Sequence, residues 1–133
     1  MPTLFTRIIN REIPAHIVAE NDQFIAFLDI NPLVEGHTLV VPKKENDYIF
    51  NLDDETLCGL HLFSKKVARA IESVVPCKRI GVSVIGIEVP HTHVHLVPLN
   101  TADDLNFTRP KLSPTAADLK SMAEKIKAVL SEN

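Results

Sequence analysis

Residues 90–98 have the sequence PHTHVHLVP, a short apolar stretch that carries histidines at alternate positions and decides the fold. Because side chains alternate across a β-strand, His91, His93 and His95 are expected on one face and the intervening residues on a buried face. A second apolar stretch, EGHTLVVP at 35–42, places His37 at the start of another strand. The sequence therefore predicts a site built from imidazoles carried by a sheet.

The periodicity of the remaining chain predicts an α+β arrangement. Alternating or β-branched runs indicate strands and apolar spacings of three and four indicate helices. We expect a meander of strands with the helices packed on one side. The predicted strands cover 17–20, 24–29, 38–41, 80–85 and 91–97, and the predicted helices cover 53–74 and 113–131, the second beginning at Ser113-Pro114.

Composition narrows the function. A chain of 133 residues is expected to form one domain, 1–133. A formal net charge of -3 argues against nucleic-acid binding, which normally needs a basic surface. No apolar stretch approaches the roughly 18 residues that a membrane span requires, and charges interrupt the N-terminus where a signal peptide would be apolar. We expect a cytoplasmic protein with no membrane or nucleic-acid partner.

Three interpretations of the histidine cluster are open. It can be a solvated strand face, but the flanking Val89, Leu96 and Val97 have core character. It can bind a metal, since imidazole suits Zn, Cu and Ni, although Glu88 is the nearest further ligand in sequence and has the opposite strand parity. It can be catalytic, because an imidazole oriented by a hydrogen bond presents an unprotonated nitrogen at neutral pH. We favour nucleophilic catalysis.

The segment 91–97, HTHVHLV, resembles the signature of the histidine triad family of nucleotide hydrolases and transferases. The similarity covers about residues 3–98, through FTRIINREIPA at 5–15, FIAFLDINP at 24–32 and GHTLVVPK at 36–43. The resemblance implies an antiparallel five-stranded sheet with a central helix and a homodimer. The C-terminal helix then belongs to an extension of this core.

The resemblance also implies roles for individual residues. His93 takes the position of the nucleophile, His95 and His37 those of phosphate ligands, and His91 orients His93 through its backbone carbonyl. Asp29, with Ile30 beside it, takes the place of the ribose ligand, which we favour over the alternative of a turn residue before Asn31-Pro32. The implied base slot consists of Leu4, Phe5, Ile8 and Phe27, and sequence alone favours a core role for the last three.

The chain departs from the family pattern in two places. Many members carry two cysteines spaced C-x-x-C at the opening that complete a zinc site, whereas this chain has Thr3 and Thr6. We therefore expect no structural zinc, and no other cofactor. In the phosphate-binding stretch, Ile87 replaces a glutamine and cannot donate a hydrogen bond, and Glu88 adds a negative charge.

These observations predict a hydrolase that cleaves the α-phosphate bond of a purine nucleoside phosphoramidate or related adenylate through a nucleotidyl-histidine. Two alternatives are a dinucleoside polyphosphate hydrolase and a nucleotide-binding module with weak turnover. A metal-binding protein is a third class. The base preference and the role of residues 99–133 do not follow from the sequence.

Overall fold

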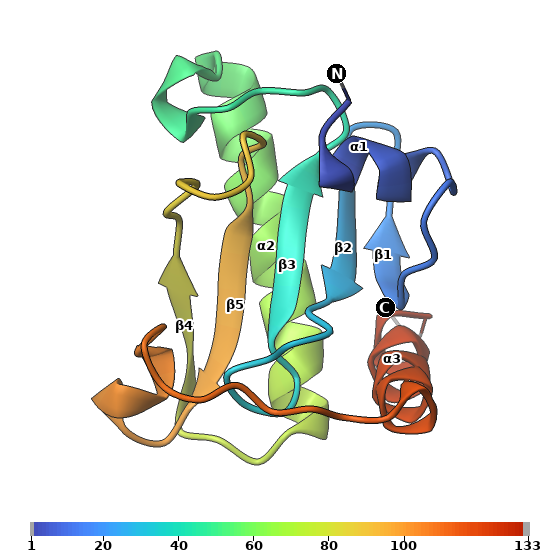
Figure 1. The fold of residues 1–133 in the computed structure, drawn as a ribbon, viewed down its shortest axis with the longest axis vertical. Coiled ribbons are helices and arrows are strands. Elements are labelled where there is room, and N and C mark those ends of the chain that lie inside the picture. The colour runs from blue at the N-terminus through green and yellow to red at the C-terminus, as the bar shows by residue number, and fades with distance from the viewer. Residues whose placement is uncertain (1, 132–133) are drawn as a thin grey trace.

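The computed structural model describes residues 2–131, so residues 1, 132 and 133 of the predicted domain lie outside the described part. Five strands form one antiparallel sheet in the order β1-β2-β3-β5-β4 (Figure 1). The strands are β1 (Ile17–Glu20), β2 (Phe24–Leu28), β3 (Thr38–Pro42), β4 (Arg79–Ser83) and β5 (Val94–Leu99). The predicted α+β class and five-stranded sheet are confirmed, but the meander is wrong, because β3 pairs with β5 rather than with β4.

Three helices accompany the sheet, together with two 3-10 turns. The helices are α1 (Leu4–Ile9), α2 (Asp54–Val74) and α3 (Ala116–Ser131), and the turns are η1 (Ile49–Asn51) and η2 (Ala102–Leu105). The central helix is confirmed, with Asp53 as its N-cap. The C-terminal helix begins later than predicted, because Thr115 and Asp118 form the capping hydrogen bonds instead of Ser113-Pro114. No helix in the described range 2–131 has the length and hydropathy needed to cross a membrane.

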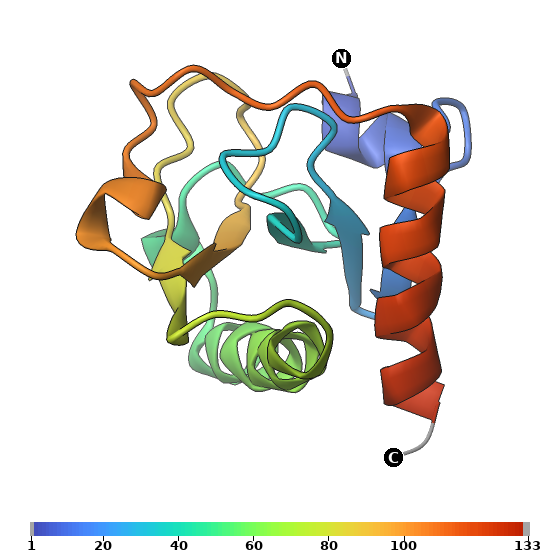
Figure 2. The same ribbon diagram turned by 90° about the horizontal axis from the view of Figure 1, so that it is seen from below.

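The sheet is covered on both faces, so the prediction of helices on one side only is wrong. Figure 2 shows α1 above the sheet and α2 below it, with α3 along one side. Alternation in β2 explains the two layers. Phe24, Ala26 and Leu28 join a core with α2 and α3, whereas Ile25 and Phe27 join a smaller core under α1. α1 was not predicted because its six residues are too few to show a helical period.

The loop between β2 and β3 positions His37 through a glycine. Gly36 has a φ of +89°, and a Cβ there would lie 2.9 Å from Cγ2 of Val75. Only glycine adopts this conformation without strain and fits this contact. Gly36 therefore allows the chain to enter β3 with His37 directly before its first residue.

The strand of the histidine motif begins three residues later than predicted. We predicted that it starts at His91, but β5 starts at Val94. The backbone before Val94 makes hydrogen bonds outside the strand ladder. The Thr92 N–H donates to Asn46 O at 2.6 Å. Pro42 O, at the end of β3, accepts a hydrogen bond from the His91 ring at 2.7 Å instead of from the backbone of a neighbouring strand. The expectation that all three rings share one strand face is therefore wrong for His91.

Candidate active site

A cleft of about 770 Å³ opens on the α1 face of the sheet. Its walls come from α1, the ends of β2 and β5, the loop between β4 and β5, and the segment between η2 and α3. The structure brings most of the predicted site residues together here: Leu4, Phe5, Ile8, Phe27, Asp29, Ile30, Ile87, Glu88, His93 and His95. His37 and His91 do not line this cleft but lie behind its wall, where the His37 ring is hydrogen-bonded to His95 and the His91 carbonyl oxygen is hydrogen-bonded to the His93 ring.

His93 is held in one tautomer by the backbone. Its Nδ1 lies 2.8 Å from the carbonyl oxygen of His91, which can only accept a hydrogen bond. Nδ1 therefore carries the proton, and Nε2 of the neutral ring keeps its lone pair. The Phe5 ring packs edge-on against the ring at a centroid distance of 5.0 Å, so the imidazole is fixed on a second side. A positioned, unprotonated nitrogen facing a cleft is the arrangement of a nucleophile or a general base.

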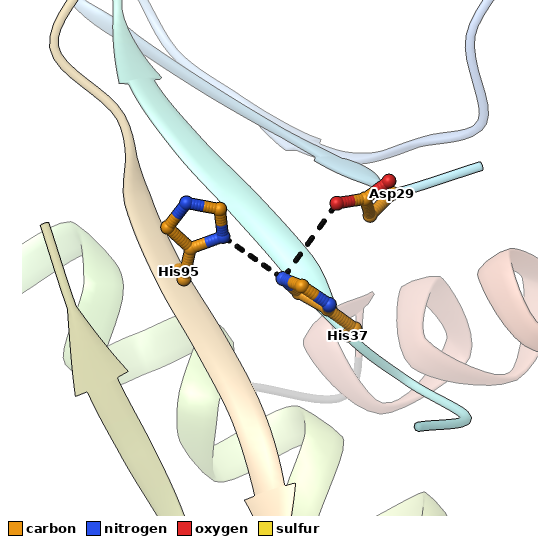
Figure 3. Close-up of side chains that lie close together, drawn as sticks. All are labelled: Asp29, His37 and His95. Atoms are coloured by element: carbon orange, nitrogen blue, oxygen red, sulfur yellow. Dashed lines mark hydrogen bonds and ion pairs between the residues drawn. The ribbon is translucent and has the colours of Figure 1, made fainter. Parts of the chain in front are cut away.

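The rings of His37 and His95 are hydrogen-bonded to each other (Figure 3), and their partners define which nitrogen of each ring carries the proton. The Leu33 N–H donates to Nδ1 of His37 at 3.1 Å, so the proton of His37 is on Nε2. That Nε2 lies 2.9 Å from Nδ1 of His95 and donates to it. His95 consequently carries its own proton on Nε2, and this N–H is available to an oxygen in the cleft.

Burial keeps these rings neutral. Desolvation lowers the pKa of His95 to about 3, with smaller contributions from His37 and His93. Desolvation likewise lowers the pKa of His37, against the opposing effect of the Asp29 carboxylate. A neutral His95 can donate a hydrogen bond from Nε2 without a charge, and an arriving anion will favour its protonation.

Asp29 follows β2 and faces the same corner of the cleft. Its Oδ1 accepts a hydrogen bond from the Asn31 N–H at 2.9 Å, which is the turn role considered from sequence. Its Oδ2 lies 3.7 Å from Nε2 of His37 and is half-buried. Because the carboxylate also lines the cleft, one residue serves the turn and presents an acceptor to a ligand.

At the apolar end of the cleft, the residues of the implied base slot have both a core role and a cleft-lining role. Phe5, Ile8 and Phe27 are buried and form a core cluster under α1, and the same side chains line the cleft. Leu4 and Ile30 are exposed at its rim. A flat apolar slot with an acceptor beside it suits a ring system joined to a hydroxylated sugar.

The loop between β4 and β5 carries Ile87 and Glu88, the second of the two departures described from sequence. Ile87 is 86% exposed, and Glu88 is exposed beside it. Both line the cleft, so this wall offers it one carboxylate, and neither side chain is a hydrogen-bond donor.

The segment between η2 and α3 supplies two residues that sequence analysis missed. Figures 1 and 2 show this segment crossing the α1 face of the sheet. The Phe107 ring packs edge-on against His95 at a centroid distance of 4.7 Å. Lys111 lines the cleft and donates from Nζ to the Phe107 carbonyl at 3.2 Å, so it brings a positive charge to the histidine end. The stretch has no periodicity that could have indicated either role.

α1 contributes a further unpredicted contact. Its N-cap Thr3 lies with Oγ1 2.7 Å from Nδ1 of His91. Glu45, which follows β3, accepts hydrogen bonds from the Thr3 N–H at 2.8 Å and from Oγ1 of Thr6 at 2.6 Å. The two threonines found at the cysteine positions of the family are thus joined to the first histidine of the motif.

The buried histidines predict a stability that falls in mild acid. Their unfolded forms take up protons below the ordinary pKa of about 6.5, whereas the folded rings resist protonation. The contribution of these neutral rings to the free energy of unfolding is therefore fully present above about pH 6.5. It is lost as the pH falls toward the pKa of His95 in the folded protein, about 3. His95 loses about 1.4 kcal/mol of its stabilising contribution for each pH unit in this window.

Urea unfolding at about pH 7.5 and about pH 5 checks this, since carboxyl groups stay ionised between these values. In His95→Gln, the drop in unfolding free energy between the two pH values is expected to be smaller, by the amount that protonation of His95 contributes. The exposed His61 on α2 provides the control, since His61→Gln should keep the full loss. Equal stabilities at the two pH values would contradict the neutral state of the buried rings.

Comparison with known proteins shows which family the chain resembles. The family model of the HIT domain matches residues 10–102. An uncharacterised HIT-like protein of Borreliella burgdorferi is 37% identical over 113 residues, which are 80% of this chain and 81% of that protein. Adenosine 5'-monophosphoramidase of Saccharomyces cerevisiae is 33% identical over 96 residues, 71% of this chain and 61% of the yeast protein. The crystal structure of a zinc-bound histidine triad family protein from Mycobacterium smegmatis matches with a TM-score of 0.83 at 26% identity, covering 97% of this chain and 93% of that chain.

The zinc of the mycobacterial protein raises the question of whether these residues suit a metal. Within residues 2–131, one group of potential ligands lies close together: Asp29, His37 and His95, with ligand atoms within 4.8 Å of one another. Two of these atoms, Nε2 of His37 and Nδ1 of His95, are 2.9 Å apart and share a proton. A zinc ion about 2.0–2.1 Å from each nitrogen would spread them further, so the observed arrangement suits a hydrogen bond better than a metal.

We accordingly predict that chelators leave stability and activity unchanged. The purified protein should contain less than about a tenth of an equivalent of zinc by elemental analysis, and dialysis against EDTA should not shift its Tm. Tightly bound zinc at one equivalent per chain would contradict this prediction.

Proposed function

This chain belongs to the histidine triad (HIT) family, and from that membership we propose that it is a nucleotide hydrolase that carries a nucleotidyl group transiently on His93. The observation that carries the proposal is the hydrogen bond from Nδ1 of His93 to the His91 carbonyl, which places the lone pair of the neutral ring on Nε2, the nitrogen that faces the cleft. The neighbouring His95 presents a proton donor at a ring-centroid distance of 4.9 Å. A nucleophile and a hydrogen-bond donor for a phosphate oxygen therefore lie side by side.

The cleft suits a nucleoside monophosphate moiety. The base would occupy the slot formed by Phe5, Ile8 and Phe27, and the half-buried carboxylate of Asp29 would accept hydrogen bonds from the ribose hydroxyls. The α-phosphate would then lie against His93 and His95. His37 would act on the phosphate through His95 rather than directly, because it lies behind the cleft with both ring nitrogens bonded.

The proposed reaction has two displacements. In the first, Nε2 of His93 attacks the α-phosphorus, a P–N bond forms to the ring, and the bond to the leaving group breaks. The leaving nitrogen or oxygen takes a proton as it departs, with the Nε2–H of His95 as the nearest donor. In the second displacement, water attacks the phosphorus and gives a proton to Nε2 of His95, the bond to His93 breaks, and a nucleoside monophosphate is released.

We propose a purine nucleoside phosphoramidate or a related adenylate as the substrate. The phosphoramidase activity named for the yeast relative supports this choice, as does the local charge, since a cleft with Asp29 and Glu88 suits an amine better than a polyanion. Turnover of adenosine and guanosine phosphoramidates, phosphorothioates and dinucleoside polyphosphates tests it. Micromolar binding without turnover of any of them would leave the chain as a nucleotide-binding module.

We also propose a homodimer that pairs the β4 edges. β4 is the last strand of the sheet, and Val82 within it is 54% exposed. The turn η1, which lies at the left of Figure 1 like β4, exposes Phe50 at 73%, and α2 behind the sheet exposes Leu62 at 67%. An unpaired edge beside exposed apolar side chains indicates an interface.

Light scattering at micromolar concentration should give twice the chain mass. Val82→Glu places a charge in the proposed interface and is expected to yield monomers, whereas Lys120→Glu on the exposed face of α3 should not. A monomeric mass for the unsubstituted protein would contradict the dimer.

A further inference from the structure

We propose that Thr3 and Glu45 are positioning residues for this reaction, and that a chain of hydrogen bonds from Glu45 through Thr3 to the His91 ring fixes the carbonyl that holds His93 in its reactive tautomer. The inference rests on the proposed function for its catalytic consequence. Its structural content, the control of the His93 tautomer, is measurable without a substrate.

The His91 ring is the centre of this network. It is completely buried and bonded at both nitrogens. Nε2 donates to the carbonyl oxygen of Pro42 at 2.7 Å, since that oxygen only accepts. In the neutral ring Nδ1 is then an acceptor, and the Thr3 hydroxyl at 2.7 Å donates to it. Burial lowers the pKa of His91, which agrees with a neutral ring.

Thr3 is fixed on its other side. Its N–H donates to Oε1 of Glu45 at 2.8 Å, and its Oγ1 accepts from the Thr6 N–H at 3.0 Å as the N-cap of α1. Oγ1 of Thr6 donates to the same carboxylate oxygen at 2.6 Å. These hydrogen bonds lower the pKa of Glu45, so the carboxylate is ionised at neutral pH. Glu45 thus clamps the first turn of α1 to the segment that follows β3.

The hydrogen bonds from Thr3 act on the same residue whose carbonyl orients His93. The carbonyl that orients His93 belongs to His91 itself, so the ring and the carbonyl share one residue. A ring held by Pro42 and Thr3 fixes the His91 backbone, and that backbone fixes the direction of its carbonyl. Because the tautomer of an imidazole follows the hydrogen bond at its other nitrogen, a displaced carbonyl would let the proton of His93 move to Nε2 and block attack.

The same residues do not form a zinc site. Threonine hydroxyls are not among the usual zinc ligands, which are thiolates, imidazoles and carboxylates. Both nitrogens of His91 already have partners at 2.7 Å. At the opening positions where many family members carry cysteines, this chain has a hydrogen-bonded clamp that fixes α1 to the first histidine without a metal.

Thr3→Val tests the proposal, since it removes the hydroxyl and keeps the shape. We expect kcat for an adenosine phosphoramidate to fall about tenfold with KM within about twofold, because the ground-state contacts are retained. The ¹⁵N chemical shifts of the His93 ring should report loss of the Nδ1–H tautomer. Thr3→Ser should restore both, and Glu45→Ala should lower kcat by about threefold to tenfold in the same direction.

Thr115→Val is the matched control, because Thr115 caps α3 with the same type of hydrogen bond but contacts no histidine in the described residues. If Thr3→Val and Thr115→Val lower Tm alike while kcat and the His93 shifts stay unchanged, Thr3 is only a helix cap and the proposal is wrong. If Thr3→Val does not fold, Glu45→Ala decides by the same two readouts. If the unsubstituted protein has no turnover, the proposed function fails, and the His93 shifts alone still decide the positioning role.

Discussion

His93→Ala is expected to abolish turnover while the protein still binds a nucleoside monophosphate. A nucleophile contributes to the chemical step, whereas the contacts of base and ribose bind substrate and product alike. Removing a covalent nucleophile lowers kcat by at least about a thousandfold in comparable cases. The Kd for AMP should change by less than about fivefold, because the slot under α1 and the Asp29 carboxylate are unaltered.

Steady-state kinetics with an adenosine phosphoramidate and calorimetric titration with AMP measure the two quantities on one preparation. His61→Ala on the exposed face of α2 should match the unsubstituted protein in both. If His93→Ala kept more than about a tenth of the original kcat, the nucleophile would have to be a different group.

The second large effect concerns the leaving group: phosphoramidates should be cleaved at least about tenfold faster than dinucleoside polyphosphates, as kcat/KM. An amine leaves easily once its nitrogen is protonated, and His95 is placed to donate. A polyphosphate instead brings several negative charges that need cations or amide donors. Ile87 provides no donor, and Glu88 on the same wall repels an anion.

The lysines near the site decide how much positive charge the cleft offers a polyphosphate. Lys43 is paired with Glu20 at 2.7 Å and does not line the cleft, whereas Lys111 does. Among the residues lining the cleft, Lys111 is the one lysine or arginine. One exposed ammonium does not match a polyphosphate chain, so the preference for phosphoramidates should hold. Lys111→Ala should lower the residual polyphosphate activity more than the phosphoramidate activity, and Lys120→Ala on α3 is its control.

Measuring kcat/KM for an adenosine phosphoramidate and a dinucleoside tetraphosphate on the same preparation decides the preference. Equal or reversed values would show that the local charge argument is wrong and would favour the polyphosphate hydrolase.

The sequence predicted those parts of the molecule that depend on local patterns. Alternation identified β1, β2 and β3, and the spacing of apolar residues identified α2 with nearly correct ends. His95, which lies in β5 and lines the cleft, also came from local sequence, because a strand alternates whatever it pairs with. Six-residue α1 and the late start of β5 depend instead on contacts with distant segments, the second on the His91 ring donating to Pro42.

The missed site residues have the same physical explanation. Glu45 is 42 positions from Thr3, and no local pattern indicates that the two meet. Lys111 and Phe107 reach the cleft only because the segment between η2 and α3 crosses the sheet face, which an aperiodic stretch does not show. His37 was expected at the phosphate, yet it lies behind His95, because its Nδ1 turns back to the Leu33 N–H.

The central claim is that His93 carries the nucleotide. Its most direct test is to mix the protein with an excess of radiolabelled adenosine phosphoramidate, quench within the first turnover under alkaline denaturing conditions, and map the label by peptide mass spectrometry. The account predicts one adenylyl group on the peptide that contains His93, and none on the corresponding peptide of His93→Ala. Turnover by the unsubstituted protein without any labelled His93 peptide, or a label that persists in His93→Ala, would contradict it.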